Sequence, residues 1–207
     1  GLVDPETVLA HVSAGGQHLR IVANGLSQPS TQDPLGITRT LWQREPQGTD
    51  PAATQFDTRK SIENHQLGLR WEDAYADHCE AWIGAYGIRR DIVQFLALPV
   101  GAQVPPSNSG GVIDLGRRSA GIEAGHRWHG TRGTLAVGIE AGQLDETRRG
   151  YENFVGTQLG VRGRLRRDED NRVGNRDLYA VADWALAPQW TVLGGMRRTH
   201  LSFVSDD

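Results

Sequence analysis

The chain has 207 residues, a formal net charge of −3 and only 38% hydrophobic residues. This length allows one or two ordinary domains, and the charge gives no overall attraction to nucleic acid. No apolar run approaches the roughly 18 residues of a membrane-spanning helix, which excludes a helical inner-membrane protein. Cys79 is the single cysteine, so neither an intramolecular disulfide nor a multi-cysteine metal site can form.

Alternating apolar and polar residues predict β-strands in the first half of the chain. Residues 6–14 and 17–26 flank a Gly-Gly dipeptide, which favours a tight turn and predicts a first hairpin. Residues 61–71 and 79–90 alternate in the same way on either side of a short break, so they predict a second hairpin.

The second half repeats this pattern. Residues 119–128 and 134–142 predict a third hairpin, and residues 178–186 and 190–203 predict a fourth around Ala187-Pro188-Gln189. The polar face of the last hairpin carries Asp183 and Arg197, which suits a wet interior better than a dry core. We therefore expect an all-β chain, an antiparallel up-and-down membrane β-barrel of which about eight strands are present.

The connections alternate between short and long, which is typical of outer-membrane barrels with short inner turns and long outer loops. The long connections are predicted at residues 27–60, 91–118 and 143–176. Five tryptophans lie near short turns and predict an aromatic belt at one membrane interface, although such residues also pack in the strand ends of soluble barrels. These five are Trp71, Trp82, Trp128, Trp184 and Trp190.

Several stretches resemble a known family. They are RRGYENF at 148–154, LRRDEDNRV at 165–173 and DLYAVADWALAPQWTVLGGMRRTHLSFVSDD at 177–207, with LSQPSTQDPLGIT at 26–38 and FDTRKSIENHQLGLRWE at 56–72. Together they resemble the barrel of TonB-dependent outer-membrane receptors, of the ferric-chelate or siderophore type. The resemblance implies a 22-stranded barrel with a separate N-terminal plug. Because no stretch resembles the plug, we expect residues 1–207 to be a single internal segment of the barrel.

The resemblance also implies a function. The protein would lie in the outer membrane of a Gram-negative bacterium, in contact with lipid, and take up a ferric chelate such as a siderophore or iron citrate. TonB and its inner-membrane energising complex would act through the plug. We expect no enzyme activity, no nucleic-acid partner and no cofactor, because iron would enter only as part of the transported chelate. The sequence leaves two alternatives open, a passive porin and a soluble all-β ligand-binding module.

Candidate site residues follow from this interpretation. No catalytic motif is present, and His126 and His129 are spaced so that they point to opposite faces of a strand, which argues against a metal pair. The outer-loop candidates for ligand binding, which could instead brace neighbouring loops, are Arg148, Arg149, Tyr151 and Asn153, followed by Arg117 and Arg118. The residues expected to face the lumen, and to contact a plug or one another, are Asn64, Gln66, Arg70, Glu123, Arg127, Glu140, Asp183 and Arg197.

Overall fold

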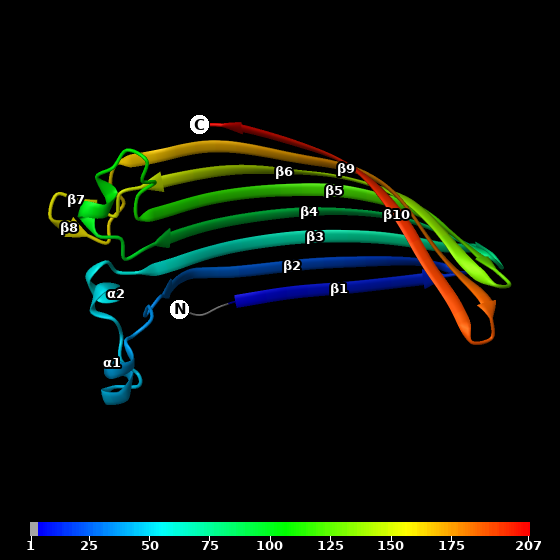
Figure 1. Cartoon of the computed structure of the whole chain (residues 1–207), viewed down its shortest axis with the longest axis horizontal. Helices are drawn as coiled ribbons and strands as arrows, with labels where there is room; N and C mark the ends of the chain where they lie inside the picture. Colours follow the sequence, from blue (N-terminus) through cyan, green and yellow to red (C-terminus); the bar gives the residue numbers. More distant parts are fainter. Residues whose placement is uncertain (1–3) are drawn as a thin grey trace.

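The computed structural model of the chain describes residues 4–207, which form one long, curved antiparallel sheet (Figure 1). Its eight strands follow one another in sequence order, each antiparallel to its neighbours. They are β1 (Asp4–Ala14), β2 (Gln17–Gln32), β3 (Arg59–Ala76), β4 (Cys79–Phe95), β5 (Val112–Gly130), β6 (Gly133–Tyr151), β9 (Leu165–Ala187) and β10 (Trp190–Asp206). The predicted all-β fold with about eight up-and-down strands is confirmed.

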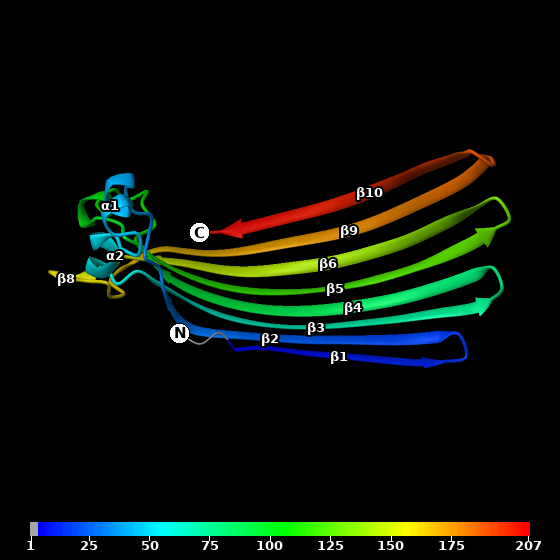
Figure 2. The same cartoon turned by 90° about the horizontal axis from the view of Figure 1, so that it is seen from below.

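The connections differ at the two ends of the sheet. Each short turn has two residues, at 15–16, 77–78, 131–132 and 188–189. Gly15 and Gly16 both have positive φ, as the tight turns that join twisted antiparallel strands require. The long connections all lie at the opposite end (Figure 2). They contain the helices α1 (Arg39–Arg44) and α2 (Pro51–Gln55), the 3₁₀ turn η1 (Val100–Gln103), and the small hairpin β7 (Phe154–Val155) and β8 (Gln158–Leu159).

The strands continue into regions that were predicted to be long loops. β5 begins at Val112, β6 extends to Tyr151 and β9 begins at Leu165. These added lengths pair in continuous register with their neighbours. They were missed because polar and charged residues occupy both faces there, so the apolar–polar alternation that marks a strand is lost while the backbone ladder persists.

The sheet has two chemically distinct faces, because directly paired residues point to the same side. One face carries Leu69, Ala85, Ile122 and Ala141, which are successive register partners on β3 to β6. We call it the apolar face. The other face, the polar face, carries Arg70, Gly84, Glu123, Glu140 and Asp177 in the adjacent register row.

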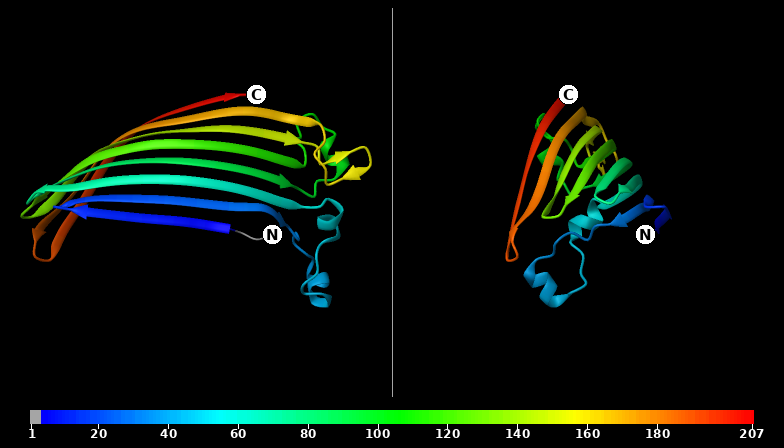
Figure 3. Two further views of the ribbon diagram at one scale, coloured as in Figure 1. Left: turned by 180° about the vertical axis from the view of Figure 1, so that it is seen from behind. Right: turned by 90° about the vertical axis from the view of Figure 1, so that its right-hand side faces the viewer.

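Neither face of the sheet is covered by a second layer (Figure 3). Ile122 is 62% exposed and Leu178 is 58% exposed, although both lie in the middle of long strands. Within residues 4–207, no helix is long and apolar enough to cross a membrane. An apolar sheet face of this extent must be buried against something else to be stable.

The apolar residues form a band that crosses the sheet obliquely. From Leu67 on β3, the register leads through Gly87, Ala120 and Gln143 to Gly174 on β9. Yet the first large apolar residue of the band on β9 is Leu178, four residues nearer the short turn. The band therefore moves toward the short turns from β3 to β9, as expected when strands are tilted against a layer of fixed thickness.

Candidate functional site

Close to the short turns, the polar face contains a tryptophan held between two arginines. Trp82 is only 4% exposed, and the guanidinium carbons of Arg70 and Arg127 lie 5.6 and 5.5 Å from its ring centre. Gly125 is its register partner on β5, where a Cβ would overlap the indole. The ring therefore lies across the glycine. The prediction that Trp82 belongs to a membrane-interface belt is wrong, because its side chain points to the polar face.

Ion pairs surround this tryptophan. Arg70 Nε lies 2.7 Å from Glu72, and the same guanidinium also pairs with Glu123 on β5. Arg127 lies 2.9 Å from Glu80. These pairs join β3, β4 and β5 across the polar face, and the cation–π contacts add to them because a guanidinium is attracted to the face of an indole ring.

A second set of ion pairs crosses the C-terminal strands. Arg197 on β10 lies 2.9 Å from Asp177 on β9 and 3.0 Å from Glu140 on β6. Asp177 is 5% exposed and also accepts hydrogen bonds from Asn175 and Thr199. A buried carboxylate with this many donors is well satisfied in its ionised form.

The register places all eight residues predicted to face the lumen on the polar face. Asn64, for example, accepts a 3.0 Å hydrogen bond from Arg90 Nε, and Asp183 accepts one from Thr134. Contacts with one another were one of the two expected outcomes. Contact with a plug stays a prediction. The eight residues are Asn64, Gln66, Arg70, Glu123, Arg127, Glu140, Asp183 and Arg197.

The arginine pairs predicted for ligand binding lie on strands rather than in loops, and alternation separates the members of each pair. Arg117 and Arg148 point to the polar face, whereas Arg118 and Arg149 point to the apolar face. Arg149 pairs with Asp168 at 2.9 Å on that side. Only Arg117 and Arg148 can therefore contact a ligand inside a barrel whose lumen is lined by the polar face.

Two further arginines join them near the long connections. Arg90 is the register partner of Arg117. Arg167 lies two residues before Glu169, which is the register partner of Arg148, so Arg167 is on the same face. The sequence pattern did not indicate either residue, although alternation places Arg90 on the same face of β4 as Trp82. The acidic residues between them are Glu146, which pairs with Arg117, and Glu169, which pairs with Arg167. We call Arg90, Arg117, Arg148 and Arg167 the rim arginines.

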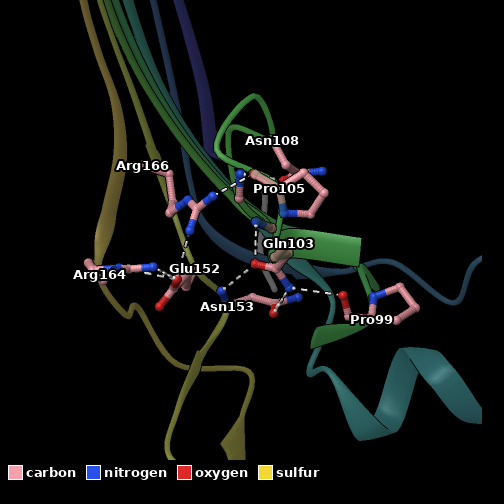
Figure 4. Close-up of polar contacts among 10 residues, drawn as sticks. Pro99, Gln103, Pro105, Asn108, Glu152, Asn153, Arg164 and Arg166 are labelled. Carbon is pink, nitrogen blue, oxygen red and sulfur yellow. Dashed lines mark hydrogen bonds and ion pairs between the residues drawn. The ribbon is translucent and has the colours of Figure 1, made fainter. Parts of the chain in front are cut away.

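Asn153, the loop candidate for ligand binding, is fully buried. Figure 4 shows its side chain beside that of Gln103. Its Nδ2 donates to the carbonyl oxygens of Leu96 and Leu98 at 2.7 and 3.1 Å, and its Oδ1 accepts from Gln103 Nε2 at 2.7 Å. The Gln103 Oε1 accepts from the backbone N–H groups of Gly111 and Asn153. The prediction that Asn153 binds ligand is wrong, because every polar atom of its side chain is used to join two loops.

The same two connections are held together at their surface. Glu152 lies 2.9 Å from Arg164 and 3.3 Å from Arg166, and Arg166 donates a 2.7 Å hydrogen bond to the carbonyl of Pro105 (Figure 4). Tyr151, another candidate, is half-buried with the guanidinium of Arg162 4.7 Å from its ring. Residues 96–111 and 152–164 therefore form one packed unit at the end of the sheet.

The other four tryptophans predicted to form the belt, together with His126 and His129, lie near the short turns. Trp71, Trp128 and Trp184 point to the apolar face, and Trp190 is 70% exposed beside a register shift on β10. His126 contacts Trp128 on the apolar face, whereas His129 lies 3.7 Å from Glu80 of the polar face. In the described part of the chain, no group of three or more His, Cys, Asp or Glu residues is arranged to hold a metal ion.

A curved antiparallel sheet with an oblique apolar band on one face and ion pairs on the other is a sector of a β-barrel wall. No family model matches the chain. Solved structures do match: the ferric citrate transporter FecA in its unliganded form has a TM-score of 0.75 at 13% identity, over 99% of this chain and 30% of that one.

Two other structures are similar. The copper transporter OprC has a TM-score of 0.56 at 14% identity, over 97% of this chain and 36% of that one. The ferric-catecholate import receptor Fiu from E. coli K12 has a TM-score of 0.61 at 11% identity, over 92% and 33%. The chain thus spans about a third of each structure. At the level of the fold, the predicted resemblance to TonB-dependent receptor barrels is confirmed. These neighbours are transporters and a receptor rather than enzymes.

Proposed function

We propose that the chain is part of the wall of an outer-membrane receptor that takes up a ferric chelate with energy supplied through TonB. The main support is the division of the sheet into two faces, since apolar side chains on one face suit lipid and ion pairs on the other suit a water-filled lumen. Passage of a chelate through the lumen enclosed by such a wall requires no covalent bond to form or break. The iron is cargo, carried by a siderophore-like or citrate-like chelate.

The rim arginines are the proposed ligand contacts of this chain. Four guanidinium groups face two carboxylates, Glu146 and Glu169, which leaves an excess of two positive charges at this end of the polar face. Ferric chelates are commonly anionic, and a planar guanidinium can hold a carboxylate through two hydrogen bonds. Arg148 is the first candidate, since within residues 4–207 its side chain has no ion-pair partner, whereas those of Arg117 and Arg167 do.

Neighbouring residues on β6 provide a matched test. Arg148→Gln removes a charge from the polar face, and Arg149→Gln removes one from the apolar face of the same strand. A charge-assisted hydrogen bond contributes about 1.5–3 kcal/mol, so we expect Arg148→Gln to weaken chelate binding roughly 10- to 150-fold. Arg149→Gln should leave the affinity unchanged. Equilibrium binding of ferric citrate and of catecholate and hydroxamate chelates to the full-length receptor would measure both.

Equal effects of the two substitutions would contradict the assignment of the site. Membrane insertion is tested separately by heat-modifiable gel mobility and detergent partitioning of the full-length protein. A protein that partitions into the aqueous phase would refute the receptor function itself. Binding of the chelate in a protein without TonB-dependent uptake would favour a passive porin instead.

A further inference from the structure

A groove crosses the apolar face from β4 to β10, next to the oblique apolar band. It has a volume of about 690 Å³, and small residues form its floor. Ala85 and Ala141 are both register partners of Ile122 in one row, and Ala120 leads through Gln143 to Gly174 in the next row toward the long connections. The groove lies where alanine and glycine occupy several positions of these two rows, which also contain Ile122 and Gln143.

The two ends of the groove differ in chemistry. Its β4–β6 end is mainly apolar, formed by alanines and Ile122 with the side chain of Gln143 beside them. Its β9–β10 end contains Arg176 and His200, which are direct register partners, with Ser202 opposite Gly174. The groove is thus amphipathic along its length, with a basic group at one end only.

Some arginines on this face have an ion-pair partner, whereas Arg176, like Arg118 and Arg198 on the same face, has none within residues 4–207. Arg149 and Arg172 pair with Asp168 and Asp145, at 2.9 and 2.7 Å. Within residues 4–207, the Arg176 guanidinium has neither an ion pair nor a hydrogen-bond partner, and its register neighbours are Ala141 and His200. A charged group on a surface that meets lipid is costly unless it reaches a polar head group or a counter-ion.

We propose that this groove binds a membrane lipid whose head group carries a phosphate. The phosphate would lie between Arg176 and His200, and the first part of an acyl chain would run over Ala141 and Ala85. The positive charge of Arg176 favours an anionic head group. The apolar end of the groove favours an amphiphile over free phosphate. Arg176 lies at the edge of the apolar band, and lipid head groups contact a barrel wall at that depth.

This inference rests on the proposed membrane location, since the groove meets lipid only if the apolar face does. Heat-modifiable gel mobility of each variant reports insertion and folding independently of lipid binding. A loss of lipid binding in a folded, inserted barrel therefore concerns the groove alone, and failure to insert concerns the proposed function.

The experiment measures lipid retained by the full-length protein after extraction from vesicles of phosphatidylcholine with phosphatidylglycerol, by native mass spectrometry. We expect phosphatidylglycerol to be retained in preference, and Arg176→Gln to reduce its retention about fivefold, the effect of one basic group near a charged surface. Gly174→Val should also reduce it by filling the groove floor without changing charge. Arg172→Gln, on the same strand and face but outside the groove, is the matched control.

Three results would overturn the proposal. The first is equal retention of the two lipids by the unsubstituted protein. The second is retention by Arg176→Gln that equals that of Arg172→Gln. The third is complete displacement of phosphatidylglycerol by millimolar inorganic phosphate, which would show that the free anion is the ligand and that the apolar end has no role.

Discussion

Replacement of Asn153 by alanine should release the packed unit formed by residues 96–111 and 152–164. The amide makes hydrogen bonds of 2.7 Å to Leu96 O and to Gln103 Nε2, and one of 3.1 Å to Leu98 O. Gln103 Nε2 and Leu98 O keep each other as partners at 2.8 Å. The part-buried Leu96 carbonyl loses its side-chain donor.

The expected cost follows from these contacts. An unsatisfied buried polar group costs about 1–3 kcal/mol, and the small cavity left by the lost amide adds to it. We therefore expect the local opening free energy of the two connections to fall by about 2–3 kcal/mol, which corresponds to a roughly 30- to 150-fold loss of amide-exchange protection. The sheet itself should keep its protection, because its ladder does not depend on Asn153.

Hydrogen–deuterium exchange on the full-length protein in detergent would measure this change. Asn108→Ala is the control, since Asn108 lies in the same connection but its side-chain oxygen accepts only from the Gly110 N–H. Protection in residues 152–164 should change little in that variant. The reasoning would be refuted if Asn153→Ala left both connections as protected as Asn108→Ala does.

Two further substitutions test the faces of the sheet. Gly125→Ala places a Cβ where the Trp82 ring lies, so it should destabilise the folded barrel by about 1–3 kcal/mol in urea titrations, whereas Gly87→Ala, which meets open space, should have little effect. Ile139→Arg, within the apolar band, should cost about 2–4 kcal/mol of folding free energy in vesicles, but Thr147→Arg, on the same strand and face beyond the band, about 0–1 kcal/mol. Equal costs within either pair would contradict the assignment of that face.

Sequence pattern predicted the parts of the sheet where one face is apolar. The segment 178–186 alternates throughout, and its hairpin forms as predicted, although the turn has two residues rather than the three expected, because Ala187 still belongs to β9. The pattern failed where charge occupies both faces. Arg117-Arg118 and Arg148-Arg149 look like loop sequence, yet they lie in continuous strand ladders, because backbone pairing does not require apolar side chains.

The errors at the candidate site have a different cause. Trp82 was assigned to the aromatic belt because it lies close to a turn in the sequence. Its environment depends instead on Gly125, its register partner on β5. Asn153 follows a stretch of arginine and tyrosine and so resembled a ligand contact. Its partner Gln103 is 50 residues away, and no local signal connects the two amides.

The oblique apolar band also indicates how steeply the strands are inclined. Between Leu67 on β3 and Leu178 on β9 the band is displaced by four residues over four strand-to-strand steps, an average of one residue per step. With about 3.4 Å per residue and 4.8 Å between strands, this displacement corresponds to strands inclined by about 35° from the perpendicular to the band. Strands inclined by about 35–45° can close into a barrel with a regular shear. The pattern of side chains on this sheet therefore matches the geometry that a closed wall requires.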